Sequence, residues 1–187
     1  MFLLNQPISF DFLGVLVAVI GIGVLSAIVF FRSKKSITSR SFFFFSFVTI
    51  FWGISNYFLY KFTDPAESLL ALRLHIFLSI WHAYAFFQLA YVFPYTDKPL
   101  PLWHRYFLLP LAFFSSTLLL VPFVFTRVSN LISVNEIVNP EKSQGIILAG
   151  IVTFSFFLAG ISVLFKRIGD SKGDERRQVI LMFSGMS

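Results

Sequence analysis

Cysteine is absent from the 187-residue sequence, and charged residues make up only 13% of it. Without cysteine there can be no disulfide, no thiolate metal ligand and no cysteine nucleophile. The shortage of charge is more informative, because the exterior of a water-soluble domain has to be largely polar. Hydrophobic residues make up 57% of the chain, and phenylalanine alone occurs 27 times. The composition therefore predicts an integral membrane protein.

Acidic residues and lysine are missing from five long apolar stretches, each about long enough to cross a hydrocarbon core of roughly 30 Å as a helix. We predict an all-α fold, a polytopic membrane helix bundle in one domain. Its five complete transmembrane helices are expected at about 12–31, 41–60, 74–94, 106–126 and 143–165. A sixth apolar run, 178–187, is too short to span, so we expect an incomplete helix and a fragment of a longer protein.

Two smaller features carry expectations of their own. Gly14, Ala18 and Gly21 share one face of the first helix, where another helix could approach closely. Packing within the molecule is the favoured interpretation, and a dimerisation motif is the weaker one. The polar connection 127–142 alternates apolar with polar residues. It is expected to form a small hairpin or an amphipathic strand on the membrane surface.

The distribution of lysine and arginine predicts the orientation of the bundle. The loops 32–40, 95–105 and 166–177 together hold eleven of these residues, whereas the N-terminus and the other two loops hold four. Since cytoplasmic loops carry the excess of positive charge, these three loops are predicted to be cytoplasmic and the N-terminus outside. The same rule explains the net charge of +6. We therefore do not expect a nucleic-acid partner.

The apolar run 74–94 is the best candidate to line a site within the membrane, because it also carries polar and amphipathic side chains. Trp81, Tyr84, Gln88 and Tyr91 recur at spacings of three and four and so form one stripe. Helix packing is the favoured interpretation of this stripe, and the wall of a small-molecule or lipid pocket between helices 2, 3 and 5 is the alternative. The candidate pocket or signal-sensing residues are Asn56, Trp81, His82, Tyr84 and Gln88.

Two of these candidates have a structural interpretation that we favour. The Asn56 amide lies well inside the second span and should point into the bundle, where an interhelical hydrogen bond would satisfy it. His82 lies near the middle of its span and could respond to protons, although a histidine bonded to a neighbouring helix is the default. His75 is expected near the outer surface.

Metal and cofactor chemistry find little support. His75 and His82 are seven residues apart, about 10 Å along a helix axis, which is too far for both to bind one metal ion. Haem ligation would require histidines on different helices, and His104 is predicted to lie in a cytoplasmic loop. No phosphate-binding loop, catalytic triad or metal-hydrolase motif occurs in the sequence. We therefore expect no cofactor, no metal and no catalytic residue.

Several motifs together resemble the N-terminal seven-helix membrane region of bacterial sensor histidine kinases. They are a basic first loop, the WGISNY stretch at 52–57, the AYVFP sequence at 90–94, the segment that reaches Gly145, and the charged DERRQ sequence at 174–178 before VILMFSG. The resemblance covers the whole chain. In that family the seventh helix leads to a cytoplasmic kinase, and related regions precede cyclic-dinucleotide synthases. This sequence ends within helix 6 and holds no kinase motif, so any catalytic activity would belong to a part not present here.

The resemblance implies a sensory input module of a two-component signal-transduction protein in the inner (plasma) membrane. The expected partners are the lipid bilayer, a second copy in a homodimer, and a cytoplasmic kinase or cyclase output domain. A small membrane transporter or lipid-handling protein with its pocket at helix 3 is the alternative. A structural membrane subunit is a weaker third hypothesis.

Overall fold

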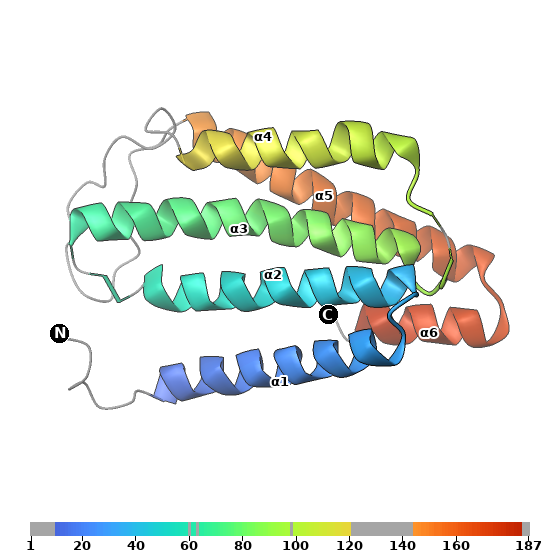
Figure 1. Ribbon diagram of the computed structural model, residues 1–187. Helices are drawn as coiled ribbons and strands as arrows, with labels where there is room; N and C mark the ends of the chain where they lie inside the picture. Colours follow the sequence, from blue (N-terminus) through green and yellow to red (C-terminus); the bar gives the residue numbers. More distant parts are fainter. Residues whose placement is uncertain (1–9, 60, 63, 98, 121–143, 185–187) are drawn as a thin grey trace.

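The computed structural model describes residues 10–59, 61–62, 64–97, 99–120 and 144–184 as an all-helical bundle (Figure 1). Its helices, in chain order, are α1 (Phe10–Arg32), α2 (Ile37–Leu59), α3 (Pro65–Val92), the short π-helix η1 (His104–Leu108), α4 (Leu109–Leu120), α5 (Gln144–Asp170) and α6 (Gly173–Ser184). The predicted hairpin at 127–142 lies outside the described residues. The all-α prediction is confirmed for the part of the chain that is described.

Helix α3 is the centre of this arrangement. It contacts α2, α4 and α5, whereas α1 packs on α2 alone and α6 follows α5. The main core cluster is built around α3 residues and completed from α4 and α5; its buried members are Ile80, Ala83, Tyr84, Phe87, Ala112, Leu119, Ala149 and Phe156. Every candidate site residue on 74–94 therefore lies on the most enclosed helix.

Within the described residues, four helices have the length and apolarity needed to cross a membrane, namely Phe12–Arg32, Ile37–Leu59, Ala66–Val92 and Gly145–Asp170. The predicted fourth span, 106–126, corresponds to η1 and α4, which are described only as far as Leu120. These four candidate spans support a polytopic membrane protein, while the count of five complete spans remains a prediction.

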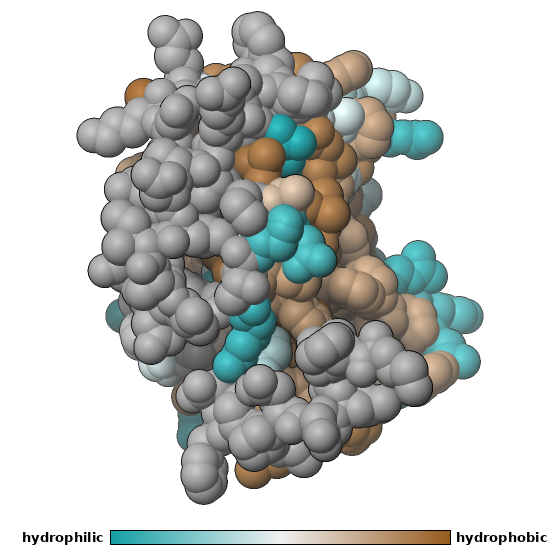
Figure 2. All heavy atoms as spheres, turned by 90° about the vertical axis from the view of Figure 1, so that its left-hand side faces the viewer, coloured by the Kyte–Doolittle hydropathy of each residue, from teal (hydrophilic) through white to brown (hydrophobic). Residues whose placement is uncertain are grey.

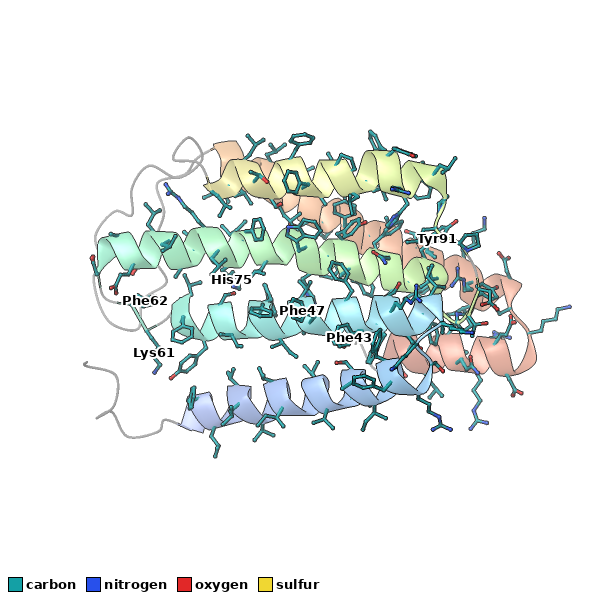
Figure 3. The ribbon with its side chains drawn as sticks, in the orientation of Figure 1. Phe43, Phe47, Lys61, Phe62, His75 and Tyr91 are labelled. Carbon is teal, nitrogen blue, oxygen red and sulfur yellow. The ribbon has the colours of Figure 1, made fainter. Side chains whose placement is uncertain are left out.

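The third helix begins earlier than predicted. Asp64 caps it, and its carboxylate accepts a hydrogen bond from the backbone N–H of Ala66 at 3.2 Å. The sequence between Lys61 and Arg73 was expected to be a connection because it carries charges. Helix formation there depends on the cap and on local propensity, which hydropathy does not measure. His75 therefore lies inside α3 and faces α2 (Figure 3), while its place near the outer surface of the membrane stays a prediction.

The sixth helix also begins earlier than predicted, within the charged segment 166–177 that was expected to be a loop. Gly173 has a φ of +59°, a left-handed conformation that lets the chain turn sharply between α5 and α6. Asp174 and Glu175 occupy the first turn of α6, where negative charge interacts favourably with the helix dipole. On α6, Val179 is fully buried in a second core cluster with Phe86, Ala90 and Leu164.

The close approach of α5 to α3 depends on Gly160. A Cβ atom at this position would lie 2.7 Å from Cε1 of Phe86 and 3.4 Å from Cα of Phe87. By contrast, Gly14 and Gly21 on α1 have no neighbouring atom within 4 Å of such a Cβ. The small-residue face of α1, expected to pack inside the molecule, is therefore exposed in the described structure.

The exterior of the bundle is unlike that of a water-soluble protein. Large apolar side chains are exposed along the outside, for example Val17 (64%) and Phe154 (64%). The buried polar residues are instead mostly serines, namely Ser26, Ser36, Ser39, Ser41, Ser46, Ser55, Ser68, Ser116 and Ser171. Figure 2 shows the end of the bundle opposite the α5–α6 turn, where apolar surface again lies between a few hydrophilic residues. Such an exterior is suited to lipid.

Candidate functional site

Four aromatic rings form a column between α2 and α3. The imidazole of His82 is stacked between Phe45, with centroids 5.1 Å apart, and Trp52, with centroids 5.2 Å apart. The other side of the Trp52 indole lies against His75, with centroids 5.4 Å apart. On each helix the two rings are seven residues apart, which places them on one face. Two antiparallel helices with this spacing therefore interleave their rings in the order Phe45, His82, Trp52, His75.

Hydrogen bonds hold the Trp52 and His75 half of this column in place. The Trp52 Nε1–H donates to the hydroxyl oxygen of Ser79 at 2.9 Å, and this hydroxyl donates to the backbone carbonyl of His75 at 2.9 Å. The Ser55 hydroxyl lies 3.2 Å from Nδ1 of His75. The polar groups of Trp52, Ser79 and Ser55 thus find partners on the facing helix or on the backbone. This is how polar side chains are accommodated where lipid offers no hydrogen bonds.

His82 is the predicted site residue that contacts most elements. Its ring touches α2 through Phe45 and Trp52, and it meets Phe157 of α5 edge-on with centroids 5.9 Å apart. Its Nε2 atom is buried and has no hydrogen-bond partner among the described residues. His82 therefore lies between α2, α3 and α5 and is enclosed by aromatic rings.

The residues of the predicted stripe on α3 contact different helices. Trp81 donates its Nε1–H to Ser116 of α4 at 3.1 Å, whereas Gln88 donates its Nε2–H to Ser41 of α2 at 3.2 Å. Tyr84 is fully buried and packs edge-on against Phe156 of α5. These contacts connect α3 to each of the helices around it. They describe helix packing, which was the favoured interpretation of the stripe.

Asn56 does not make the predicted interhelical hydrogen bond within the described residues. Its side chain is half-buried, and the preceding residue, Ser55, reaches His75 instead. The hydropathy pattern identified the correct turn of α2. It could not distinguish which of two adjacent polar residues faces α3, because neighbouring residues on a helix point about 100° apart.

His104 is a second correction, since it lies in a buried helical turn and not in a loop. Its side chain is only 3% exposed. The imidazole packs on Tyr84, with centroids 5.3 Å apart, and is stacked on Phe87, with centroids 6.3 Å apart and planes 15° apart. Burial lowers the pKa of His104 from its ordinary value of 6.5. Two prolines and neighbouring basic residues suggested a loop here, and the burial of His104 depends on tertiary packing, which the sequence pattern does not contain.

Arg167 was not singled out from the sequence, yet it joins two helices at the end of the bundle. It is only 8% exposed. Its guanidinium donates to the backbone carbonyls of Ala90 at 3.2 Å and Tyr91 at 2.6 Å. It also lies over the ring of Tyr95 at 4.9 Å. The last carbonyls of a helix have no partner within the helix, so Arg167 of α5 caps the C-terminus of α3.

Thr38 completes this junction from α2. Its hydroxyl donates to the backbone carbonyls of Val92 and Tyr95, and the backbone N–H of Ile37 donates to the carbonyl of Thr96 at 2.9 Å. The end of α3 is therefore held by side-chain and backbone bonds from both α2 and α5. We call this set of contacts, made by Arg167 and Thr38, the α3 junction.

The histidines and carboxylates of the described residues do not gather at one point. Among the residues that the structure describes, no group of three or more histidine, aspartate or glutamate side chains could hold a metal ion. His75 and His82 have the Trp52 ring between them. The column, the core around Tyr84 and the α3 junction are thus built from packing and hydrogen bonds between helices.

Comparison with known proteins identifies the family. A family model described as the N-terminal 7TM region of histidine kinase matches residues 15–187. No curated protein and no solved structure matches the chain. The family region is a sensory, non-catalytic part of histidine kinases. Because the match covers nearly the whole sequence, the chain is an integral membrane protein that belongs to the family of N-terminal seven-helix regions of histidine kinases.

Proposed function

We propose that this chain is the membrane-embedded sensory input module of a signal-transduction protein, and that it couples a stimulus to a cytoplasmic output domain of kinase or cyclase type outside these 187 residues. The observation that carries the proposal is the family match over 15–187. It is supported by the apolar exterior, which suits a module that receives its stimulus within or across the membrane.

In the proposed orientation the N-terminus is outside the cell and the segments 32–40, 95–105 and 166–177 are cytoplasmic. The charge count supports this arrangement. The same three segments lie at one end of the bundle, on the right of Figure 1. The α3 junction belongs to this end, so we place it next to the cytoplasm, where the chain leads toward an output domain.

The proposed coupling route runs from α3 through Arg167 to α5 and α6. Since Arg167 holds the α3 C-terminus to α5, a displacement of α3 along its axis has to move α5 or break these bonds. Val179 of α6 packs in the same cluster as Ala90 of α3 and Leu164 of α5. A displacement of α3 or α5 should therefore also displace α6. We further propose that the module acts as a homodimer; the exposed small-residue face of α1 at Gly14 and Gly21 leaves room for a second copy.

The decisive experiment uses the full-length gene product in nanodiscs and measures ATP-dependent autophosphorylation or cyclic-dinucleotide synthesis. We expect Arg167→Met to change the basal output at least several-fold, whereas Lys166→Met, an exposed neighbour, leaves it unchanged. A full-length protein without a kinase or cyclase domain would refute the proposal. An unaltered output in a folded Arg167→Met protein would refute the coupling route alone.

Because the sequence contains no cysteine, the orientation can be tested separately by labelling introduced cysteines. Single-cysteine variants Ser33→Cys and Lys61→Cys carry their thiols at opposite ends of the bundle. In intact cells a membrane-impermeant maleimide should label Lys61→Cys, and Ser33→Cys should react only after permeabilisation. The reverse pattern would show that the N-terminus is cytoplasmic.

A further inference from the structure

An uneven distribution of charge marks the end of the bundle that holds the α3 junction. Nine lysine and arginine side chains are exposed there, which we call the basic surface: Arg32, Lys34, Lys35, Arg40, Arg105, Lys166, Lys172, Arg176 and Arg177. Four exposed carboxylates share this end, at Asp97, Asp170, Asp174 and Glu175. Within the described residues none of the nine cations forms an ion pair with a carboxylate. The basic surface thus keeps a large excess of unneutralised positive charge.

These cations lie at the level where the apolar exterior ends. Arg32 follows Phe31, which is 66% exposed, and Lys34 lies over the same ring at 5.1 Å. Lys166 likewise follows the exposed Phe165. Residues within one helical turn are only about 5 Å apart along the axis. A lipid whose acyl chain covers Phe31 or Phe165 therefore has its headgroup within reach of a cation.

The first turns of α6 extend this relationship to the helix that follows the segment 166–177. Arg176 and Arg177 are exposed and are followed by Ile180 and Leu181, both exposed apolar residues, while Val179 faces the core. Asp174 and Glu175 precede the two arginines in the first turn, so this end of α6 is charged and its next turn is apolar, which suits the boundary between headgroups and acyl chains. Juxtamembrane clusters of four to eight lysines and arginines attract anionic lipids by about 1 kcal/mol per residue.

We propose that the basic surface binds acidic phospholipid headgroups of the surrounding bilayer, and that Lys35, Arg176 and Arg177 contribute to this preference. The positive-inside rule accounts for the side of the membrane on which such residues lie. It does not by itself predict a preference for one lipid over another, which is the property that the proposal adds. The proposal does not depend on a kinase or cyclase domain, so it can fail or succeed independently of the proposed function.

The test reconstitutes the chain into vesicles of equal parts phosphatidylglycerol and phosphatidylcholine, with brominated acyl chains on one lipid or the other. Bromine quenches tryptophan fluorescence at short range, and Trp103 is exposed at this end of the bundle. We expect brominated phosphatidylglycerol to quench more than brominated phosphatidylcholine, with a relative binding constant of about 3 to 10 at low salt that falls toward 1 in 0.5 M NaCl. Trp103→Phe should remove most of the difference. Equal quenching by the two lipids would overturn the proposal.

A charge-matched pair of variants locates the preference. Replacing Lys35, Arg176 and Arg177 by glutamine should lower the relative binding constant at least twofold. Replacing Lys61, Arg127 and Lys142, which the sequence places on the opposite side, removes the same charge and should leave it unchanged. Equal effects of the two triple variants would refute the assignment to the basic surface.

Two further measurements address a triple variant that does not fold and binding of a soluble phosphate. If the triple variant does not fold, Lys35→Gln and Arg176→Gln are measured singly, and each should lower the preference; no effect of either would refute the assignment. Adding millimolar glycerol phosphate should not abolish the preference for phosphatidylglycerol. If it does, the surface binds a soluble phosphate and the lipid proposal is wrong.

Discussion

The indole of Trp52 is stacked on the imidazole of His82, with the ring planes 13° apart. One ring comes from α2 and the other from α3, so this contact joins the two helices at the middle of the bundle. Since Trp52 also donates a hydrogen bond to Ser79, stacking and hydrogen bonding fix the same side chain. The two contributions can be separated by mutation.

Trp52→Phe keeps a ring against the histidines but removes the N–H donor. We expect it to lower the free energy of unfolding by about 1 kcal/mol, the typical value of one hydrogen bond between membrane helices. Ser79→Ala leaves the Trp52 N–H without its acceptor and should cost about 1–3 kcal/mol. Because both substitutions remove the same bond, the double variant should be much less destabilised than the sum. Additive losses in chemical unfolding would show that this bond contributes nothing.

Gly160→Ala tests the close approach of α5 to α3. The new methyl group would overlap the ring of Phe86, which is itself buried, so we expect a loss of about 1–3 kcal/mol. Gly150→Ala is the matched control on the same helix, because a Cβ there meets no atom within 4 Å. It should be neutral or slightly stabilising, since alanine favours helix. Equal melting temperatures for the two variants would contradict the packing described here.

Arg167→Met tests the α3 junction as a structural element, separately from signalling. The substitution keeps much of the side-chain volume but leaves the carbonyls of Ala90 and Tyr91 without their donor. We expect a loss of about 2–3 kcal/mol, because hydrogen bonds from a charged group are stronger than average. Amide hydrogen exchange should become faster at residues 90–97. Unchanged exchange there would mean that Thr38 alone holds the end of α3.

His104 should make stability depend on pH. Burial lowers its folded-state pKa, so the unfolded chain binds the proton more readily than the folded one. Stability is therefore fully present above the unfolded pKa of about 6.5 and is lost as the pH falls below it. His104→Phe retains a ring against Phe87 and Tyr84 and should flatten the fall in melting temperature between pH 7 and pH 5.5. Equal slopes for the variant and the wild type would exclude His104 as a source of the effect.

Much of the fold could be predicted from the sequence because lipid imposes a simple rule. A run of about 20 apolar residues has to be helical when water is absent, and α1, α2 and α5 appear close to where hydropathy placed them. The first residues of α3 and α6 could not be predicted from hydropathy. Asp64 and Gly173 determine where these helices begin, and both act through local backbone geometry in segments whose charges suggested loops.

The candidate site was only partly accessible to the same reasoning. His82 and Gln88 were recognised as polar groups inside a span, and each does contact α2. Arg167 was counted only as one of several basic loop residues. Its role depends on two carbonyls more than seventy residues away in the sequence, and no pattern within one helix contains that information.

The nine serines that are buried among the described residues constrain how this sequence can change in evolution. At these positions the bundle encloses a small side chain, whereas elsewhere in the core it encloses large ones such as Tyr84 and Leu119. Leucine or phenylalanine is tolerated at positions such as Phe47, where the side chain is exposed. The same apolar residue at Ser46 or Ser116, both buried where helices meet, would force the helices apart. Sequences that drift from this one should therefore conserve size at these positions more strictly than they conserve polarity.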